Sequence, residues 1–139
     1  MLNNNFNYIN RLIAFGIFLL TFIVYFDTMA PTVSYWDCGE FIAVSHTLGV
    51  PHPPGSPFFL LLGRIFSMLP FNEDIAFRVN IISPLVSALA VMLLYLSTVK
   101  VVTHWRGRVN SLSDCLIVFG GGAAGALAFA FTDSHWFNA

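Results

Sequence analysis

Charged residues are scarce in this 139-residue chain, in which six Lys and Arg and seven Asp and Glu make up only 9% of the sequence. A soluble domain carries about a quarter charged residues, so this chain has too few to cover a water-facing surface. Its formal net charge of −1 also provides no basic field for nucleic acid. Together with 57% hydrophobic residues, this scarcity disfavours disorder, collagen-like repeats and a soluble enzyme domain, and it indicates a lipid environment.

Motifs of common soluble enzymes are missing as well. The sequence has no H-E-x-x-H or paired C-x-x-C zinc spacing, no G-x-x-x-x-G-K phosphate loop and no G-x-S-x-G nucleophile elbow. No internal repeat is present either. Any chemistry must therefore come from residues that do not follow these patterns.

Three long apolar runs are present instead, and they predict an all-α polytopic membrane protein. About 20 apolar residues cross about 30 Å of hydrocarbon, and we place the spans at about residues 9–28, 76–102 and 115–132. A cleaved secretory signal is the alternative for the first run, but Pro31 and the lack of a preceding basic cluster favour a span. Pro84 predicts a kink in the second run, and Gly121 and Gly125 predict close approach of another helix to the third.

The connection at residues 27–75 is predicted to be a large outside loop. Within it, residues 57–69 form an apolar run that is too short to span and is typical of an interfacial or re-entrant helix. Four of the six basic residues then fall on one side of the membrane: Arg11, Lys100, Arg106 and Arg108. The positive-inside rule places that side and the N-terminus inside, and the loop and the C-terminus outside. Cys38 and Cys115 lie on different sides and cannot pair.

Two carboxylates lie close together in the outside loop. Ser34 or Asp37 could cap a helix that runs to about Leu48 and stops at Gly49. Asp37 and Glu40 are three residues apart and therefore project from one side of this helix. A partly desolvated carboxylate beside another is a common way to make a general base. The spacing alone favours the alternative, a capping box in which both acids bind free amides of the helix.

A histidine follows in a stiff turn, G-V-P-H-P-P-G. Prolines on both sides fix the backbone around His52, so its ring could contact phosphate, shuttle a proton or bind a metal, or simply face water. No zinc pattern connects it with His46 and Cys38. No metal or other cofactor is predicted, although Mg²⁺ or Mn²⁺ on Asp37 and Glu40 stays open, because such ions need only one or two carboxylates.

Two arginines are the cations of the outside loop. A guanidinium matches phosphate oxygens in bidentate fashion, so Arg64 and Arg78 could each hold an anionic head group. Arg64 could equally snorkel along the membrane surface. For Arg78 an ion pair with Asp74, four residues earlier, is the favoured interpretation.

The segment at residues 34–63 resembles a known family. In order it contains W-D-C-G-E-F, S-H-T-L-G-V and H-P-P-G-S-P, followed by a run rich in Phe and Leu. This resembles multi-pass membrane proteins, formerly a domain of unknown function, that are related to the protein O-mannosyltransferases of the GT-C glycosyltransferase superfamily. The segment departs from the family at Cys38, where serine is usual, and at Ser56, where an aromatic residue is common; neither change removes a carboxylate.

The resemblance implies a membrane glycosyltransferase. It implies transfer of a sugar, most simply mannose, from a polyprenyl-phosphate donor to Ser or Thr of an exported protein acceptor. Asp37 is then the general base and Glu40 its partner. His52 and the Pro-Pro-Gly after it then shape the site, and Arg64 or Arg78 could stabilise the departing phosphate. The residues expected to bind substrate are His52, Arg64, Arg78, Trp36 and His46.

The resemblance also implies more spans than three. Residues 1–139 are therefore expected to be the N-terminal part of a GT-C-like domain that needs the remaining helices for activity, in a bacterial inner membrane with the loop on the periplasmic side. Two alternatives stay open: a transporter or flippase segment for a lipid-linked intermediate, and a non-catalytic membrane scaffold. The near absence of charge in the middle of the spans counts against a transporter.

Overall fold

The computed structural model describes residues 2–53, 55–107 and 111–139, and every regular element in these ranges is a helix. The chain divides into two compact units. One unit contains Met1–Asp27 and Val86–Ala139, and the other is Thr28–Leu85. They are called the three-helix unit and the loop unit below. Three helices are long and apolar enough to cross a membrane, as predicted, at Asn5–Thr28, Ile75–Arg106 and Leu112–Ala130.

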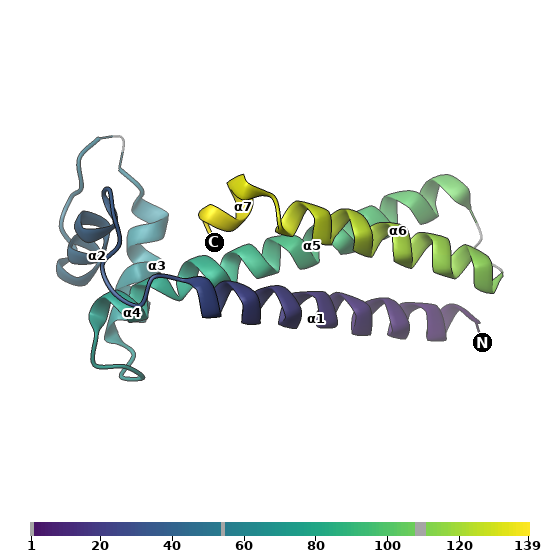
Figure 1. Cartoon of the computed structure of the whole chain (residues 1–139), viewed down its shortest axis with the longest axis horizontal. Coiled ribbons are helices and arrows are strands. Elements are labelled where there is room, and N and C mark those ends of the chain that lie inside the picture. Colours follow the sequence, from purple (N-terminus) through teal and green to yellow (C-terminus); the bar gives the residue numbers. More distant parts are fainter. Residues whose placement is uncertain (1, 54, 108–110) are drawn as a thin grey trace. The chain divides into compact units, whose positions relative to one another are not determined.

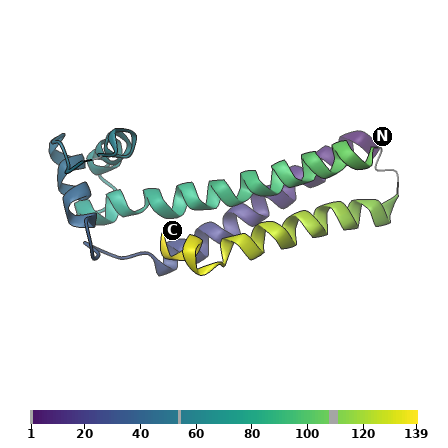
Figure 2. The same cartoon turned by 90° about the horizontal axis from the view of Figure 1, so that it is seen from above.

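The three-helix unit consists of α1 (Leu2–Thr28), most of α5 (Ile82–Arg106), α6 (Leu112–Ala130) and the short α7 (Asp133–Phe137). Figures 1 and 2 show α1, α5 and α6 side by side, with α5 running opposite to the other two. The beginning of α1, the end of α5 and the beginning of α6 lie at one end of this unit. Lys100 and Arg106 therefore lie toward the N-terminal end, as the predicted sorting of charge requires; Arg108 lies outside the described residues.

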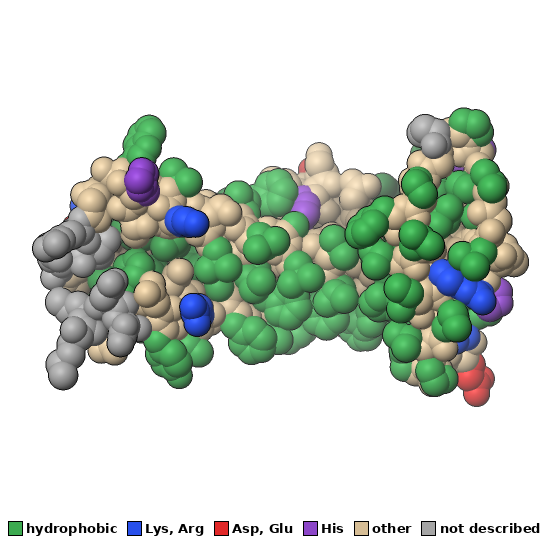
Figure 3. Space-filling view, turned by 180° about the vertical axis from the view of Figure 1, so that it is seen from behind, with side chains coloured by type: hydrophobic (Ala, Val, Ile, Leu, Met, Phe, Trp, Pro, Cys, Tyr) green, Lys and Arg blue, Asp and Glu red, His purple; other side chains and the backbone are tan. Residues whose placement is uncertain are grey.

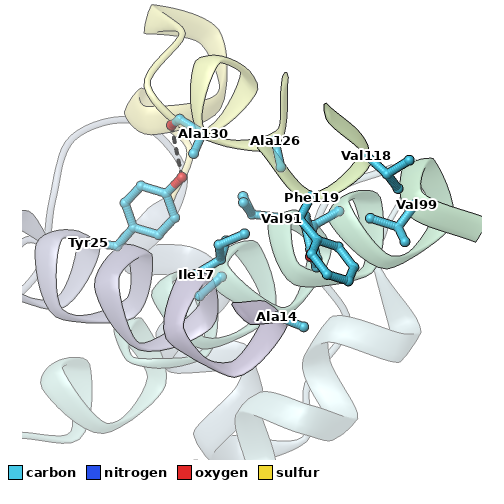
Figure 4. Packing of buried hydrophobic residues seen from close by; sticks show 11 residues of the cluster. Ala14, Ile17, Tyr25, Val91, Val99, Val118, Phe119, Ala126 and Ala130 are labelled. Atoms are coloured by element: carbon cyan, nitrogen blue, oxygen red, sulfur yellow. Dashed lines mark hydrogen bonds between the residues drawn. The ribbon is translucent and has the colours of Figure 1, made fainter. Parts of the chain in front are cut away.

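Small, branched and aromatic side chains form the core between these helices (Figure 4). The core residues are Ala14, Ile17 and Tyr25 of α1, Ala88, Val91, Tyr95 and Val99 of α5, and Val118, Phe119, Ala126 and Ala130 of α6. The Tyr25 hydroxyl donates a 2.8 Å hydrogen bond to the carbonyl of Ala130. This bond matters because the interior offers the hydroxyl no water. Figure 3 shows hydrophobic side chains along the outside of the same unit, as lipid contact requires.

The close helix contact of α6 occurs one residue away from its predicted place. A Cβ built on Gly122 would lie 3.1 Å from Val99 Cγ2 and 3.3 Å from Tyr95 Cε2, whereas nothing lies within 4 Å of one built on Gly121 or Gly125. The prediction of that pair as a contact was therefore wrong within the described chain. The buried positions of α6 repeat every four residues from Val118, and this row contains Gly122.

The predicted kink near Pro84 is a break between two helices. The run that begins at residue 75 divides into α4 (Ile75–Asn80) and α5, which starts at Ile82. Pro84 has no N–H to donate to the carbonyl four residues earlier, that of Asn80. Ile81, between the two helices, keeps right-handed helical dihedral angles (φ −60°, ψ −16°), and α4 and α5 together form one candidate span.

The loop unit packs α2 (Cys38–Thr47), α3 (Pro57–Met68) and α4 around a small core of Ile42, Ala76, Val79 and Ile82. Three polar side chains hold its segments together through backbone carbonyls. Arg64 donates to the carbonyl of His46, and Arg78 donates to those of Ser67 (2.8 Å) and Leu69 (3.1 Å). The Asn80 amide donates to the carbonyls of Ala30 and Thr32 at 3.0 and 2.9 Å.

The closest approach of α2 and α3 is at Ser45 and Gly63, both of them buried. A Cβ built on Gly63 would lie 2.8 Å from the Ser45 Cβ and closer still to its hydroxyl. The lack of a side chain at Gly63 is therefore what lets α3 lie directly on α2.

Gly63→Ala is expected to destabilise the loop unit. The methyl group would force apart two packed helices, which typically costs about 1–3 kcal/mol, more than the gain of up to about 1 kcal/mol in helix propensity. Hydrogen–deuterium exchange of α2 and α3 measures the effect. Gly16→Ala in α1 is the matched control because its Cβ would meet nothing within 4 Å. Equal exchange in both variants would contradict the packing described here.

Candidate functional site

The first turn of α2 carries the two carboxylates. Asp37 is the N-cap residue and Glu40 lies in the first turn. Just before them, Trp36 has a left-handed backbone with φ of 61° and is 90% exposed. Non-glycine residues rarely adopt this conformation, so the chain turns sharply here before it enters the helix. The Asp37 side chain makes no capping hydrogen bond.

Both oxygens of Glu40 bind His52. The backbone N–H of His52 donates to Glu40 Oε1 at 2.8 Å, and the ring Nδ1 lies 2.7 Å from Oε2. The predicted capping box is therefore wrong: neither acid caps α2, because Glu40 binds a residue twelve positions later and Asp37 does not bond to the helix amides. The helix still ends near its predicted boundary, with Leu48 in the left-handed conformation and a bond from the N–H of Gly49 to the carbonyl of Val44.

The turn around His52 presents its ring to both acids. Pro51 is buried, and the N–H of Gly55 donates to the carbonyl of His52 at 3.1 Å. Gly55 has a φ of +74°, which a side chain would strain. The ring of Phe41 lies edge-on against the imidazole, with 6.2 Å between the centroids. Pro54, the second proline of the predicted stiff turn, lies outside the described residues.

His52 lies between the two carboxylates. While Nδ1 binds Glu40, Nε2 is 3.8 Å from Asp37 Oδ2. The Asp37 side chain is 63% exposed, against 38% for Glu40. Asp37 is thus the more exposed of the two acids, and Glu40 is the acid that holds the histidine.

Hydrogen bonding shifts the protonation of the pair in opposite directions. The backbone and ring of His52 both stabilise the ionised form of Glu40 and lower the pKa of this carboxyl from its ordinary 4.5. In return, the hydrogen bond and negative charge of Glu40, with a smaller contribution from Asp37, raise the pKa of His52 from 6.5. An ion pair between Glu40 and His52 is therefore favoured over a wide range around weakly acidic pH.

The cluster has a donor set that could hold a divalent ion. One ligand atom from each of Asp37, Glu40 and His52 can be chosen so that all lie within 4.8 Å of one another. Carboxylate oxygens suit Mg²⁺ and Mn²⁺, and an imidazole nitrogen suits transition metals.

The other residues predicted for the site lie in the loop unit but do not join this cluster. The NH1 groups of Arg64 and Arg78 bind backbone carbonyls, and the predicted ion pair of Arg78 with Asp74 is absent from the ion pairs among the described residues. Asp74 instead caps α4, accepting from the N–H of Ala76 at 2.8 Å. The side chains of Trp36 and His46 are exposed.

Two features of the site were missed from the sequence. The hydrogen bonds of Asn80 fix the segment that leads to Asp37. The sequence signal that could have indicated them is an amide side chain inside an otherwise apolar run. The contact between Glu40 and His52 was missed because twelve residues and a helix end separate the two groups.

Residues 37–139 match the family described as the protein O-mannosyl-transferase TMEM260 N-terminal domain. A curated relative from Dictyostelium discoideum, named protein O-mannosyl-transferase tmem260, is 38% identical over 98 residues. The mouse protein O-mannosyl-transferase TMEM260 is 35% identical over 95 residues. Each alignment covers 68% of this chain but only 12% and 13% of the respective relative. No solved structure matches the chain.

Proposed function

Because the chain belongs to the TMEM260 N-terminal-domain family, we propose that it forms the first part of a membrane protein O-mannosyltransferase. In this proposal mannose passes from a polyprenyl-phosphate donor to a Ser or Thr hydroxyl of an exported protein, on a GT-C-type fold. The observation that carries the proposal is the cluster of Asp37, Glu40 and His52, which lies within the family match and begins at its first residue. The remaining helices of a longer protein would complete the cavity.

Asp37 is proposed as the general base. It is the more exposed carboxylate, while both oxygens of Glu40 bind His52. As the acceptor hydroxyl attacks the anomeric carbon, its proton passes to Asp37 and the bond from that carbon to the phosphate oxygen breaks. The phosphate leaves already charged, so a base is required and a strong general acid is not. One displacement inverts the configuration at the anomeric carbon.

The departing phosphate needs positive charge, which the carboxylates do not supply. Arg64 and Arg78 remain the proposed sources, because a guanidinium has five N–H donors and their carbonyl bonds use NH1 alone. Trp36 and His46 are exposed and are proposed to contact donor or acceptor. The reaction itself is proposed to need no cofactor, with a divalent ion on the acidic cluster as the variant to test.

The loop unit is proposed to lie on the side of the membrane opposite to the basic residues Lys100 and Arg106. Lys100 and Arg106 belong to the last turns of α5, and this end of α5 lies beside the beginning of α1. Basic residues next to membrane spans are enriched on the cytoplasmic side. In a bacterial inner membrane the loop unit would then face the periplasm. The two relatives are eukaryotic, and in their cells the same side of the membrane would face a lumen.

The proposal is tested with the complete protein purified in detergent. Incubation with a polyprenyl-phosphate mannose and a Ser/Thr-containing peptide is expected to give mannosylated peptide, detected by mass spectrometry. Detergent removes the two compartments that a flippase needs, so product formation also separates the enzyme from a transporter. Failure to form product, together with unchanged O-mannosylated proteins in cells lacking the gene, would overturn the proposal.

A further inference from the structure

The outward face of α3 is a continuous apolar stripe. Phe58, Leu61, Ile65 and Met68 are 76%, 60%, 56% and 65% exposed. They are spaced three, four and three residues apart, so they line one side of the helix from end to end. This set is called the α3 stripe below. Each member is a large hydrophobic residue that is more than half exposed.

The opposite face of α3 is fixed against the rest of the loop unit. Leu60, Gly63 and Ser67 are buried there, and Gly63 lies directly on Ser45 of α2. Arg64 is turned toward α2, since its guanidinium binds the carbonyl of His46. Arg78 of α4 binds the end of α3 through the Ser67 carbonyl. Rotation of α3 to bury the stripe would break these contacts, so the stripe stays outward.

The chain on both sides of the loop unit enters candidate membrane spans. The span at Asn5–Thr28 ends where the loop unit begins, and the span at Ile75–Arg106 starts within the loop unit itself. A segment attached at both ends in this way is held at the membrane surface. The 12 residues of α3 extend about 18 Å, well short of the about 30 Å of hydrocarbon. The helix can therefore lie along the boundary but cannot cross.

We propose that the α3 stripe inserts into the boundary between headgroups and acyl chains of the bilayer, and so anchors the loop unit on the membrane surface. Lipid is the occupant that the chemistry favours, because the stripe carries no charge and no side-chain hydrogen-bonding group. The proposal concerns membrane contact only and does not depend on the transfer reaction.

Charge does not drive this contact. Residues 28–85 contain four acids, Asp37, Glu40, Glu73 and Asp74, and two basic residues, Arg64 and Arg78, which gives a formal charge of −2 with neutral histidines. An anionic membrane surface would repel such a segment. The contact is therefore expected in phosphatidylcholine, which has no net charge, and it should not weaken at high salt. The membrane contact of a basic amphipathic helix, in contrast, would weaken.

The experiment measures the surroundings of single spin labels in the whole chain, because the spans would keep any variant in the membrane fraction. Each variant carries one cysteine for the spin label, introduced as Leu61→Cys or Ile65→Cys in a background with Cys38→Ser and Cys115→Ala. The labelled chain is reconstituted into phosphatidylcholine vesicles. Collision rates are measured with oxygen, which concentrates in lipid, and with a water-soluble nickel chelate. Leu93→Cys in the second span is the lipid reference, and Ala43→Cys on the exposed side of α2 is the water reference.

Labels at positions 61 and 65 are expected to collide with oxygen more often than the label at position 43 but less often than the mid-span label at position 93, because they lie only about 5–10 Å below the headgroups. They should collide with the nickel chelate less often than the label at position 43. Their collision rates should be the same at about 0.1 and 1 M salt. Access to the nickel chelate equal to that at position 43 would show that the stripe faces water. Low access to both reagents would show that protein covers it. Either result overturns the proposal.

Discussion

Replacing Asp37 with Asn in the complete protein is expected to lower mannose transfer by about 10²–10⁴-fold, the usual contribution of a general base. The amide has nearly the same shape as the carboxylate but cannot accept the hydroxyl proton. Because the Asp37 side chain is largely exposed and does not cap α2, the variant should fold and reach the membrane as the unaltered protein does. The rate of peptide mannosylation at equal protein concentration measures the effect.

The matched control is Glu73→Gln, which also removes one negative charge from the loop unit. Glu73 is exposed and is not part of the acidic cluster. It is expected to leave the rate near that of the unaltered protein. Transfer by Asp37→Asn at the rate of Glu73→Gln would remove Asp37 from the role of base.

Glu40→Ala is expected to lower transfer by about 10²-fold, for a different reason. The change removes both hydrogen bonds that hold His52, at its backbone N–H and at Nδ1. The turn would then lose its attachment to α2, and a displacement of about 1 Å in an active site can cost about 10² in rate. Glu40→Gln should lose less, because its amide oxygen can still accept from the His52 backbone N–H.

A double-mutant cycle with His52→Ala separates this positioning role from independent contributions. Since the two side chains act through one contact, the double variant should be about as slow as either single variant. Faster hydrogen exchange at the His52 amide in Glu40→Ala would report the freed turn directly. Multiplicative losses with unchanged exchange would contradict a shared role.

The membrane helices could be predicted from the sequence because their signal is long and local. Apolar runs of about 20 residues have few alternatives to spanning helices, and three such helices are present. Even the break near Pro84 follows from a single missing N–H. The contact face of α6 was less predictable: Gly120, Gly121 and Gly122 are adjacent, and only the rotation of the helix against Tyr95 and Val99 selects Gly122.

The sequence placed Asp37, Glu40 and His52 in one loop but did not predict the bonds between them. The D-x-x-E spacing favours a capping box, and the choice against it depends on a turn twelve residues later that places His52 on Glu40. The left-handed conformation of Leu48, with Gly49 directly after it, likewise follows from the way the chain leaves α2. Spacing alone could not decide whether Asp74 caps α4 or forms an ion pair with Arg78, because both partners lie within four residues of it. In the structure Asp74 accepts from the N–H of Ala76, and Arg78 binds the carbonyl of Ser67.

The carbonyl bonds of Arg64, Arg78 and Asn80 have a consequence for how this chain can vary through evolution. Their acceptors belong to the main chain of Ala30, Thr32, His46, Ser67 and Leu69. Substitutions at these five positions leave the acceptor oxygens in place, whereas loss of one donor side chain removes one or two bonds at once. The framework of the loop unit therefore depends on three donor side chains, and these bonds by themselves place no requirement on the side chains of the residues that accept them.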